Sequence, residues 1–159
     1  MKGDKKVIEY LNKALTLELT TVNQYFLHAR MYKDWGLDRI SKIEYEESID
    51  EMKHADELIE RILYLNGLPN VQDLEKVYIG EHIKECLECD LKAELRAHPL
   101  YIEAIEYFES VKDYVSREIL VRILESEEEH IDYIETQLDL IDKIGVERYM
   151  QSQMIDVGK

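Results

Sequence analysis

Two Glu-x-x-His units stand out as chemistry-bearing residues, Glu51 with His54 and Glu127 with His130. At ~100° per residue, the first unit shares a helical face with apolar residues and should therefore be buried with them. These apolar residues are Leu58, Ile62 and Leu65. Burying a charged carboxylate costs several kcal/mol unless it is paired or bound to a metal. The pattern therefore requires a compensating positive charge in the interior.

Two further glutamates, Glu18 and Glu94, also lie on apolar helical stripes. Glu18 shares its stripe with Leu11 and Leu15, and Glu94 occupies the same place in a second copy of the pattern. One constant shift along the chain superposes Glu18 on Glu94, Tyr25 on Tyr101, Glu51 on Glu127 and His54 on His130. Such a repeat predicts a duplicated helical hairpin, with an approximate two-fold axis relating its halves.

Four inward carboxylates cannot all stay charged in a dry core, because like charges in contact drive some of them to protonate. Two divalent cations would neutralise the cluster. A carboxylate-rich set with one histidine per metal suits iron or manganese, and carboxylates can bridge metals ~3.5–4 Å apart. The predicted ligands are Glu18, Glu51, His54, Glu94, Glu127 and His130. Tyr25, close to Glu18, would either donate an electron or hydrogen-bond to a ligand.

The elements that must position these residues are helices. Periodicity predicts helices over 5–34, 38–66, 82–111, 113–143 and 146–153, with Gly36, Gly67 and Gly145 as stops. Segment 68–81 is too long for a tight turn and should cross to the far end of a bundle. We therefore predict an all-α four-helix bundle with a short fifth helix, forming one domain over 1–159 from hairpins 5–66 and 82–143. Pro99 should kink or bulge the third helix.

Composition narrows the possible partners. A net charge of −15 leaves little material for a basic patch that could bind nucleic acid or an anionic membrane. No apolar run approaches ~18 residues and no secretory leader is evident, so we expect a cytoplasmic protein. Cys86 and Cys89 form a single C-x-x-C without the second pair that a structural zinc site needs. His28, His82 and His98 lack the preceding glutamate and are not predicted as ligands.

The ligand pattern is that of ferritin-like di-iron bundles, and the chain closely resembles the bacterioferritins along nearly its whole length. The resemblance is carried by MKGDKKVI, NQYFLHARM, ESIDEMKHAD, DYVSRE and EEEHIDY. It implies two irons per subunit, one held by Glu18 and His54, the other by Glu94 and His130, with Glu51 and Glu127 bridging. The implied function is iron storage and detoxification. A ferroxidase would oxidise Fe²⁺ with O₂ or H₂O₂ and deposit ferric mineral inside a 24-subunit shell.

Met52 sits ~100° around the helix from Glu51 and must point elsewhere. It continues a second apolar stripe with Tyr45 and Ile49, and Leu19, Val22 and Phe26 form a comparable stripe on the first helix. A two-fold dimer contact would cover both stripes. From the residues alone, Met52 would fill that contact. The resemblance implies instead that two Met52 side chains ligate one haem b per subunit dimer, which assists iron release with electrons from a small ferredoxin.

Some positions depart from the family pattern. Glu46 stands where several bacterioferritins have a histidine near the inner surface, and Leu58, Pro99 and Tyr133 are also unusual. Two alternatives stay open. One is a rubrerythrin-like peroxidase or another di-iron carboxylate protein on the same bundle, although a rubrerythrin would need a second C-x-x-C pair. The other is a metal-free structural bundle, which would leave the repeated buried acids unexplained.

Overall fold

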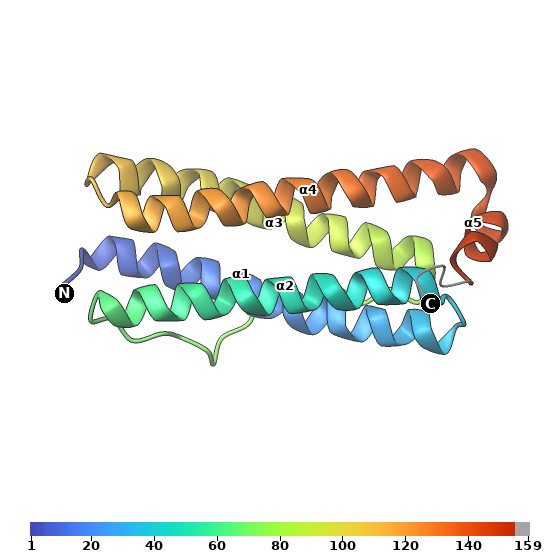
Figure 1. Ribbon diagram of the computed structural model, residues 1–159, viewed down its shortest axis with the longest axis horizontal. Coiled ribbons are helices and arrows are strands. Elements are labelled where there is room, and N and C mark those ends of the chain that lie inside the picture. The colour runs from blue at the N-terminus through green and yellow to red at the C-terminus, as the bar shows by residue number, and fades with distance from the viewer. Residues whose placement is uncertain (155–159) are drawn as a thin grey trace.

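The computed structural model describes residues 1–154, and within them the chain is a bundle of long helices. The long helices are α1 (Lys5–Asp34), α2 (Asp38–Tyr64), α3 (Ile83–Ser110) and α4 (Tyr114–Ile144), and the short α5 (Val146–Gln153) packs at one end (Figure 1). The predicted all-α bundle is confirmed, and the predicted helix bounds are correct to within two residues. No helix in the described residues is long and apolar enough to cross a membrane.

Helix ends follow local chemistry that the sequence carries. The Asp4 carboxylate accepts hydrogen bonds from two backbone N–H groups in the first turn of α1, and Asp113 accepts one at the start of α4. Gly36 and Gly145 adopt positive φ angles of 81° and 86°, as expected of helix stops. At the end of α2 the left-handed residue is Asn66, with φ of 63°, rather than Gly67.

Gly67 is needed for a different reason. A Cβ atom added there would lie 2.7 Å from Cγ2 of Ile8 and 2.9 Å from Cγ2 of Ile62. The glycine therefore allows the chain leaving α2 to pass close to α1. In α3, the helix continues through Pro99 to Ser110, so the proline does not end it.

The crossover between α2 and α3 runs alongside α1 and is held by hydrogen bonds rather than by regular secondary structure. Side chains spaced by four or eight residues along α1 accept hydrogen bonds from backbone N–H groups of the crossover. The pairs are Asn12 with Asn70 at 2.8 Å, Thr20 with Glu75 at 2.9 Å, Gln24 with Tyr78 at 2.9 Å and His28 with Gly80 at 3.1 Å. These bonds satisfy backbone groups that a helix or a sheet would otherwise pair.

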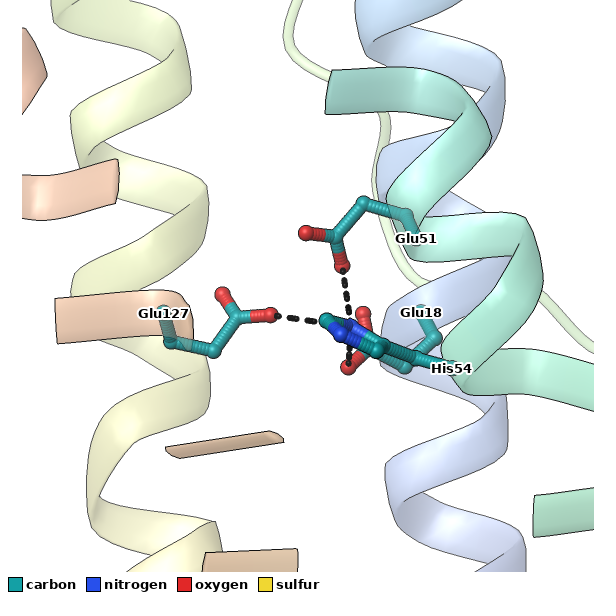
Figure 2. Close-up of side chains that lie close together, drawn as sticks. All are labelled: Glu18, Glu51, His54 and Glu127. Atoms are coloured by element: carbon teal, nitrogen blue, oxygen red, sulfur yellow. Dashed lines mark ion pairs between the residues drawn. The ribbon is translucent and has the colours of Figure 1, made fainter. Parts of the chain in front are cut away.

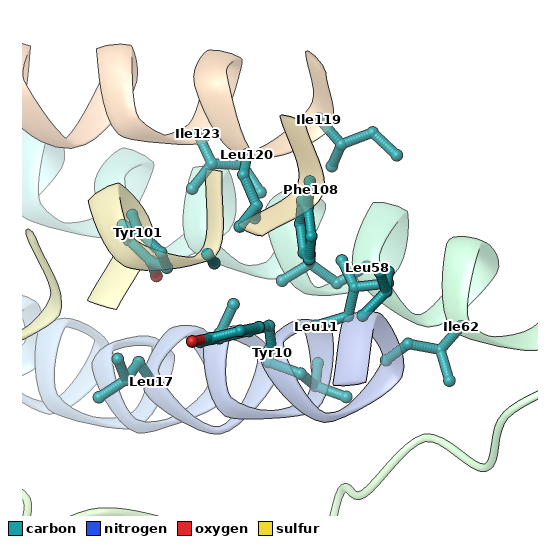
Figure 3. Packing of buried hydrophobic residues seen from close by; sticks show 14 of the residues in the cluster. Tyr10, Leu11, Leu17, Leu58, Ile62, Tyr101, Phe108, Ile119, Leu120 and Ile123 are labelled. Carbon is teal, nitrogen blue, oxygen red and sulfur yellow. The ribbon is translucent and has the colours of Figure 1, made fainter. Parts of the chain in front are cut away.

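The core consists of two apolar clusters with a polar layer between them. One cluster lies at the end where α1 begins and includes Leu11, Leu58, Phe108 and Leu120 (Figure 3). The other lies towards α5 and includes Ile40, Leu87 and Ile134. In each long helix, the buried acidic residues fall between the segments that supply the two clusters. The polar layer is thus enclosed from both ends by closely packed apolar side chains.

Candidate metal centre

The six predicted ligands converge in the middle of the bundle. Glu18 comes from α1, Glu51 and His54 from α2, Glu94 from α3, and Glu127 and His130 from α4. Each of the four carboxylate residues is at most 2% exposed. His54 is the most accessible of the six, with 16% of its side chain exposed. The structure therefore brings together every residue predicted for the cluster.

One half of the centre is arranged around His54. Its Nδ1 atom lies 3.4 Å from Glu18 Oε1, 3.8 Å from Glu51 Oε2 and 4.0 Å from Glu127 Oε1. Figure 2 shows these side chains pointing at one another from three helices. One ligand atom from each of the four residues can be chosen so that all lie within 4.8 Å of one another. This half could hold a metal ion.

The other half is arranged around His130. Its Nδ1 atom lies 3.2 Å from Glu94 Oε1 and 3.7 Å from Glu47 Oε2. Glu47, Glu51 and His130 form a second group whose ligand atoms lie within 4.8 Å of one another. Glu51 therefore belongs to both groups and is placed to bridge them.

Glu47 was missed by the sequence analysis. It lies one helical turn before Glu51, so the i, i+4 spacing on α2 already put both on one face. Its side chain is 25% exposed, whereas Glu94 on the same histidine is fully buried. Glu47 is thus an acidic group between the centre and solvent. Burial raises its pKa to about 7, against the lowering influence of His130.

Tyr25 makes the hydrogen bond that the sequence allowed. Its buried hydroxyl donates to Glu94 Oε1, and its ring packs edge-on against His130 with centroids 5.1 Å apart. In the other half, Tyr101 lies near Glu18; burial, followed by the charge of Glu18, raises the pKa of the Tyr101 hydroxyl. The two tyrosines thus accompany matching glutamates in the two halves.

Several buried polar atoms of the centre have no hydrogen-bond partner within residues 1–154. They are Glu18 Oε1, His54 Nδ1, Glu94 Oε2 and Glu127 Oε1. A buried polar group left unpaired costs about 1–3 kcal/mol, and more when it is charged. These oxygen and nitrogen atoms converge from four helices, and metal ions placed between them would accept their lone pairs. The residues present therefore fit a pair of metal ions.

When no metal is bound, protons offset the negative charge of the cluster. Burial raises the pKa of Glu18 well above its usual range, and the charge of Glu51 adds to this effect. Burial likewise raises the pKa of Glu94. Burial alone would lower the pKa of His130, but its hydrogen bond to Glu94 and the charge there raise it to about 9. A metal ion must displace these protons to bind.

Comparison with known proteins identifies the class first. Residues 8–144 match the ferritin-like domain family. Among similar proteins, the bacterioferritin of Brucella melitensis is 54% identical over 151 residues, which cover 95% of this chain and 94% of the relative. The bacterioferritin of Rhodobacter capsulatus is 51% identical over 145 residues, covering 91% and 90%. That of Streptomyces coelicolor is 45% identical over 152 residues, covering 96% and 91%. The chain belongs to the bacterioferritins.

Metal binding is expected to release protons. The metal-free centre holds a proton on His130, whose pKa is raised to about 9, and burial raises the pKa values of Glu18 and Glu94. Because a ligand must lose its proton, affinity for Zn²⁺ should rise with pH until His130 titrates at about 9, and should fall in acid. Isothermal titration calorimetry in buffers of different ionisation enthalpy measures the release directly. Heats that do not depend on the buffer would contradict this assignment.

Proposed function

We propose that this chain oxidises Fe²⁺ at the six-residue centre and stores the ferric product. The observation that carries this proposal is the convergence of four buried carboxylates and two histidines. Four of the six residues, Glu18, His54, Glu94 and Glu127, each keep a buried atom without a hydrogen-bond partner among residues 1–154. Iron storage with ferroxidase activity is the function of the family to which the chain belongs. The 54% identity to a bacterioferritin favours this function over the rubrerythrin-like peroxidase that the sequence left open.

We assign one iron to Glu18 and His54 and the other to Glu94 and His130, with Glu51 and Glu127 bridging. The short distances support this division, since each histidine lies nearest the glutamate assigned to the same iron, at 3.4 and 3.2 Å. Glu51 is common to both ligand groups, and Glu127 Oε1 lies within 4.0 Å of the opposite histidine. Two bound irons supply the two electrons that O₂ or H₂O₂ takes up.

Neighbouring side chains hold the ligands in place. Tyr25 donates to Glu94 and limits rotation of that carboxylate. Thr21 Oγ1 lies 3.3 Å from Glu51 Oε2 and can orient the bridging group. Glu47 is partly exposed beside His130, so its carboxylate can bind a cation that passes from solvent to the buried ligands. These contacts position the carboxylates of the centre.

The outward face of α1 and α2 supports the proposed haem site. Met52 is 47% exposed, whereas Glu51 beside it is 1% exposed, so the two point to different sides of α2 as predicted. Tyr45 and Ile49 continue the same stripe along α2, and the Phe26 ring of α1 lies 5.8 Å from the Tyr45 ring. These three residues are each about two-fifths exposed in the single chain. A two-fold dimer would cover this apolar face and bring two Met52 thioethers together on one haem b iron. Bound there, the haem would pass electrons inward for iron release.

We further propose that such dimers build a hollow 24-subunit shell and that a small ferredoxin supplies the electrons to the haem. Support for a homo-oligomer comes from the family and from the exposed apolar stripes on α1 and α2. The net charge of −15 per chain suits a container that attracts Fe²⁺.

Loss of a ligand should stop rapid oxidation. Glu51→Ala, and separately His54→Ala with His130→Ala, should slow stopped-flow Fe²⁺ oxidation by more than ~100-fold, since losing even an outer-shell partner costs 10–100-fold. The helical assembly should persist, and stability of the metal-free Glu51→Ala protein should change little or rise, because one carboxylate is removed from a buried cluster of like charges. Glu60→Ala, an exposed glutamate on the same helix, is the control. Wild-type rates in a ligand variant would refute the assignment.

The haem proposal is tested at Met52. Wild-type protein expressed with ample haem should carry one b-type haem per two subunits, and Met52→Leu should lose its Soret absorption while keeping Fe²⁺ oxidation and particle size. Met154→Leu changes another exposed methionine and serves as the control. A variant at Met52 that binds haem as before, or a wild type that binds none, would show that the thioether is not an axial ligand.

A further inference from the structure

A second buried polar cluster lies next to the metal centre and plays no part in the function proposed above. It consists of His28 on α1, Glu44 on α2 and Asp90 on α3, which are 0%, 5% and 0% exposed. One ligand-type atom from each lies within 4.8 Å of the others. The cluster is a helical turn away from the centre, since Asp90 precedes Glu94 by four residues.

The hydrogen bonds of His28 fix its protonation state. The backbone N–H of Gly80 donates to His28 Nε2 at 3.1 Å, so this nitrogen presents a lone pair. The proton of the neutral ring therefore resides on Nδ1, which lies 2.8 Å from Asp90 Oδ1 and donates to it. Both ring nitrogens are committed. A metal ion could use this imidazole only by displacing the Gly80 peptide, so the cluster does not suit a second metal.

The two carboxylates have unequal surroundings. Asp90 Oδ1 accepts hydrogen bonds from His28 and from Gln24 Nε2, the latter at 2.9 Å. The nearest ring nitrogen to Glu44 Oε2 is His28 Nδ1 at 3.9 Å, beyond hydrogen-bond reach. Glu44 Oε2 and Asp90 Oδ2 are both buried, and neither has a hydrogen-bond partner in the part of the chain that the structure describes. The negative charge is thus stabilised on Asp90, whereas no donor among residues 1–154 reaches the buried Oε2 atom of Glu44.

We propose that Glu44 and Asp90 share one proton carried by Glu44, and that this acid–carboxylate pair is a positioning device that anchors the crossover to the bundle. With its proton, Glu44 donates towards Asp90, which gives both unpartnered oxygens a role. Burial raises the pKa of Glu44 well above its usual range, and the charge of Asp90 adds to this. Burial would raise the pKa of Asp90, but hydrogen bonds from Glu44 and His28 lower it.

Groups from every packed helix face this pair, and they are neutral or acidic. They are Tyr32 on α1, Glu47 on α2, Cys86 on α3, Tyr133 on α4 and Tyr149 on α5. The positive charge of Arg39 acts to lower the pKa values of Tyr133 on α4 and Tyr149 on α5. None of these contacts gives Glu44 the positive charge that a second buried anion would need, which leaves the proton as the neutralising cation.

The anchoring runs from Asp90 outward to the crossover. Asp90 accepts hydrogen bonds from Gln24 and His28. Gln24 in turn accepts one from the Tyr78 N–H, and His28 accepts one from the Gly80 N–H. A Cβ atom at Gly80 would collide with the backbone of Cys86, so the crossover lies directly against the first turn of α3. Cys86, Asp90 and the metal-centre residue Glu94 follow one another along α3. The pair therefore fixes how α1, α3 and the crossover meet beside the metal centre.

The device should work over a limited pH range. The raised pKa of Glu44 favours the folded contact at low pH, and that contribution is lost as pH rises through this pKa. The lowered pKa of Asp90 has the opposite effect, since its contribution is lost as pH falls through it. Protection of the crossover should therefore be bell-shaped in pH, with an acid limb below the ordinary aspartate range.

Infrared spectroscopy of the Zn²⁺-loaded protein tests for the proton itself. Metal-bound carboxylates are ionised, and at about pH 8 Glu47 is largely ionised too. A protonated-carboxyl C=O band that shifts in D₂O should appear in the wild type, vanish in Glu44→Gln and persist in Glu46→Gln, an exposed neighbour on α2. No such band in the wild type, or a band that survives Glu44→Gln, would overturn the proposal.

Hydrogen exchange of the assembled protein tests the anchoring. Asp90→Ala should lower protection of the Tyr78 and Gly80 amides by ~10-fold, because their acceptors lose support. Glu44→Gln should keep neutral-pH protection, since its amide can donate to Asp90 as the acid does, but should remove the alkaline limb because the amide cannot ionise. An alkaline limb that is unchanged in Glu44→Gln would refute the shared proton, even though the crossover stays in place.

Discussion

The repulsion among carboxylates at the middle of the bundle is the constraint around which the molecule is organised. Each long helix brings one glutamate of the centre into a site that is almost inaccessible to solvent. The cost is tolerated because two apolar clusters, one towards each end of the bundle, supply the burial that stabilises the fold. Since the polar layer lies between them, each helix must change from apolar to acidic and back again along one face. The sequence pattern follows directly from this requirement.

Two buried clusters built from the same residue types meet this repulsion in different ways. In the metal centre, His54 Nδ1 and three carboxylate oxygens are left without partners, so the site keeps its electron pairs available for cations. In the neighbouring cluster, both nitrogens of His28 are used, one by a backbone N–H and one by Asp90. The backbone of the crossover makes this difference, because it supplies a donor at Gly80. Proximity of acids and a histidine is therefore insufficient to identify a metal site.

Much of the fold and the six-residue centre could be predicted from the sequence, because helical periodicity translates directly into a shared face. The Glu-x-x-His unit of the first hairpin and its repeat in the second indicated the centre, although a duplicated origin and the single-domain assignment over 1–159 stay predictions. The repeat did not indicate Glu47, because the residue superposed on it in the second hairpin is Ile123. The pair of Glu44 and Asp90 could not be found, because it depends on how three helices and the crossover pack. Of the other histidines, His82 caps α3 and His98 lies 2.8 Å from the exposed Glu128.

Helical geometry also explains how one short segment of α2 can serve two separate sites. Successive residues point ~100° apart, so Glu51 and His54 face the core while Met52 faces outward. The proposed haem and the metal centre would then lie on different sides of a single helix, whose diameter with side chains is ~10–12 Å. Neither site needs a loop or an insertion to bring it close to the other. Because both are attached to one rigid element, a change in the packing of α2 would alter the ligands of the metal centre and the dimer face together.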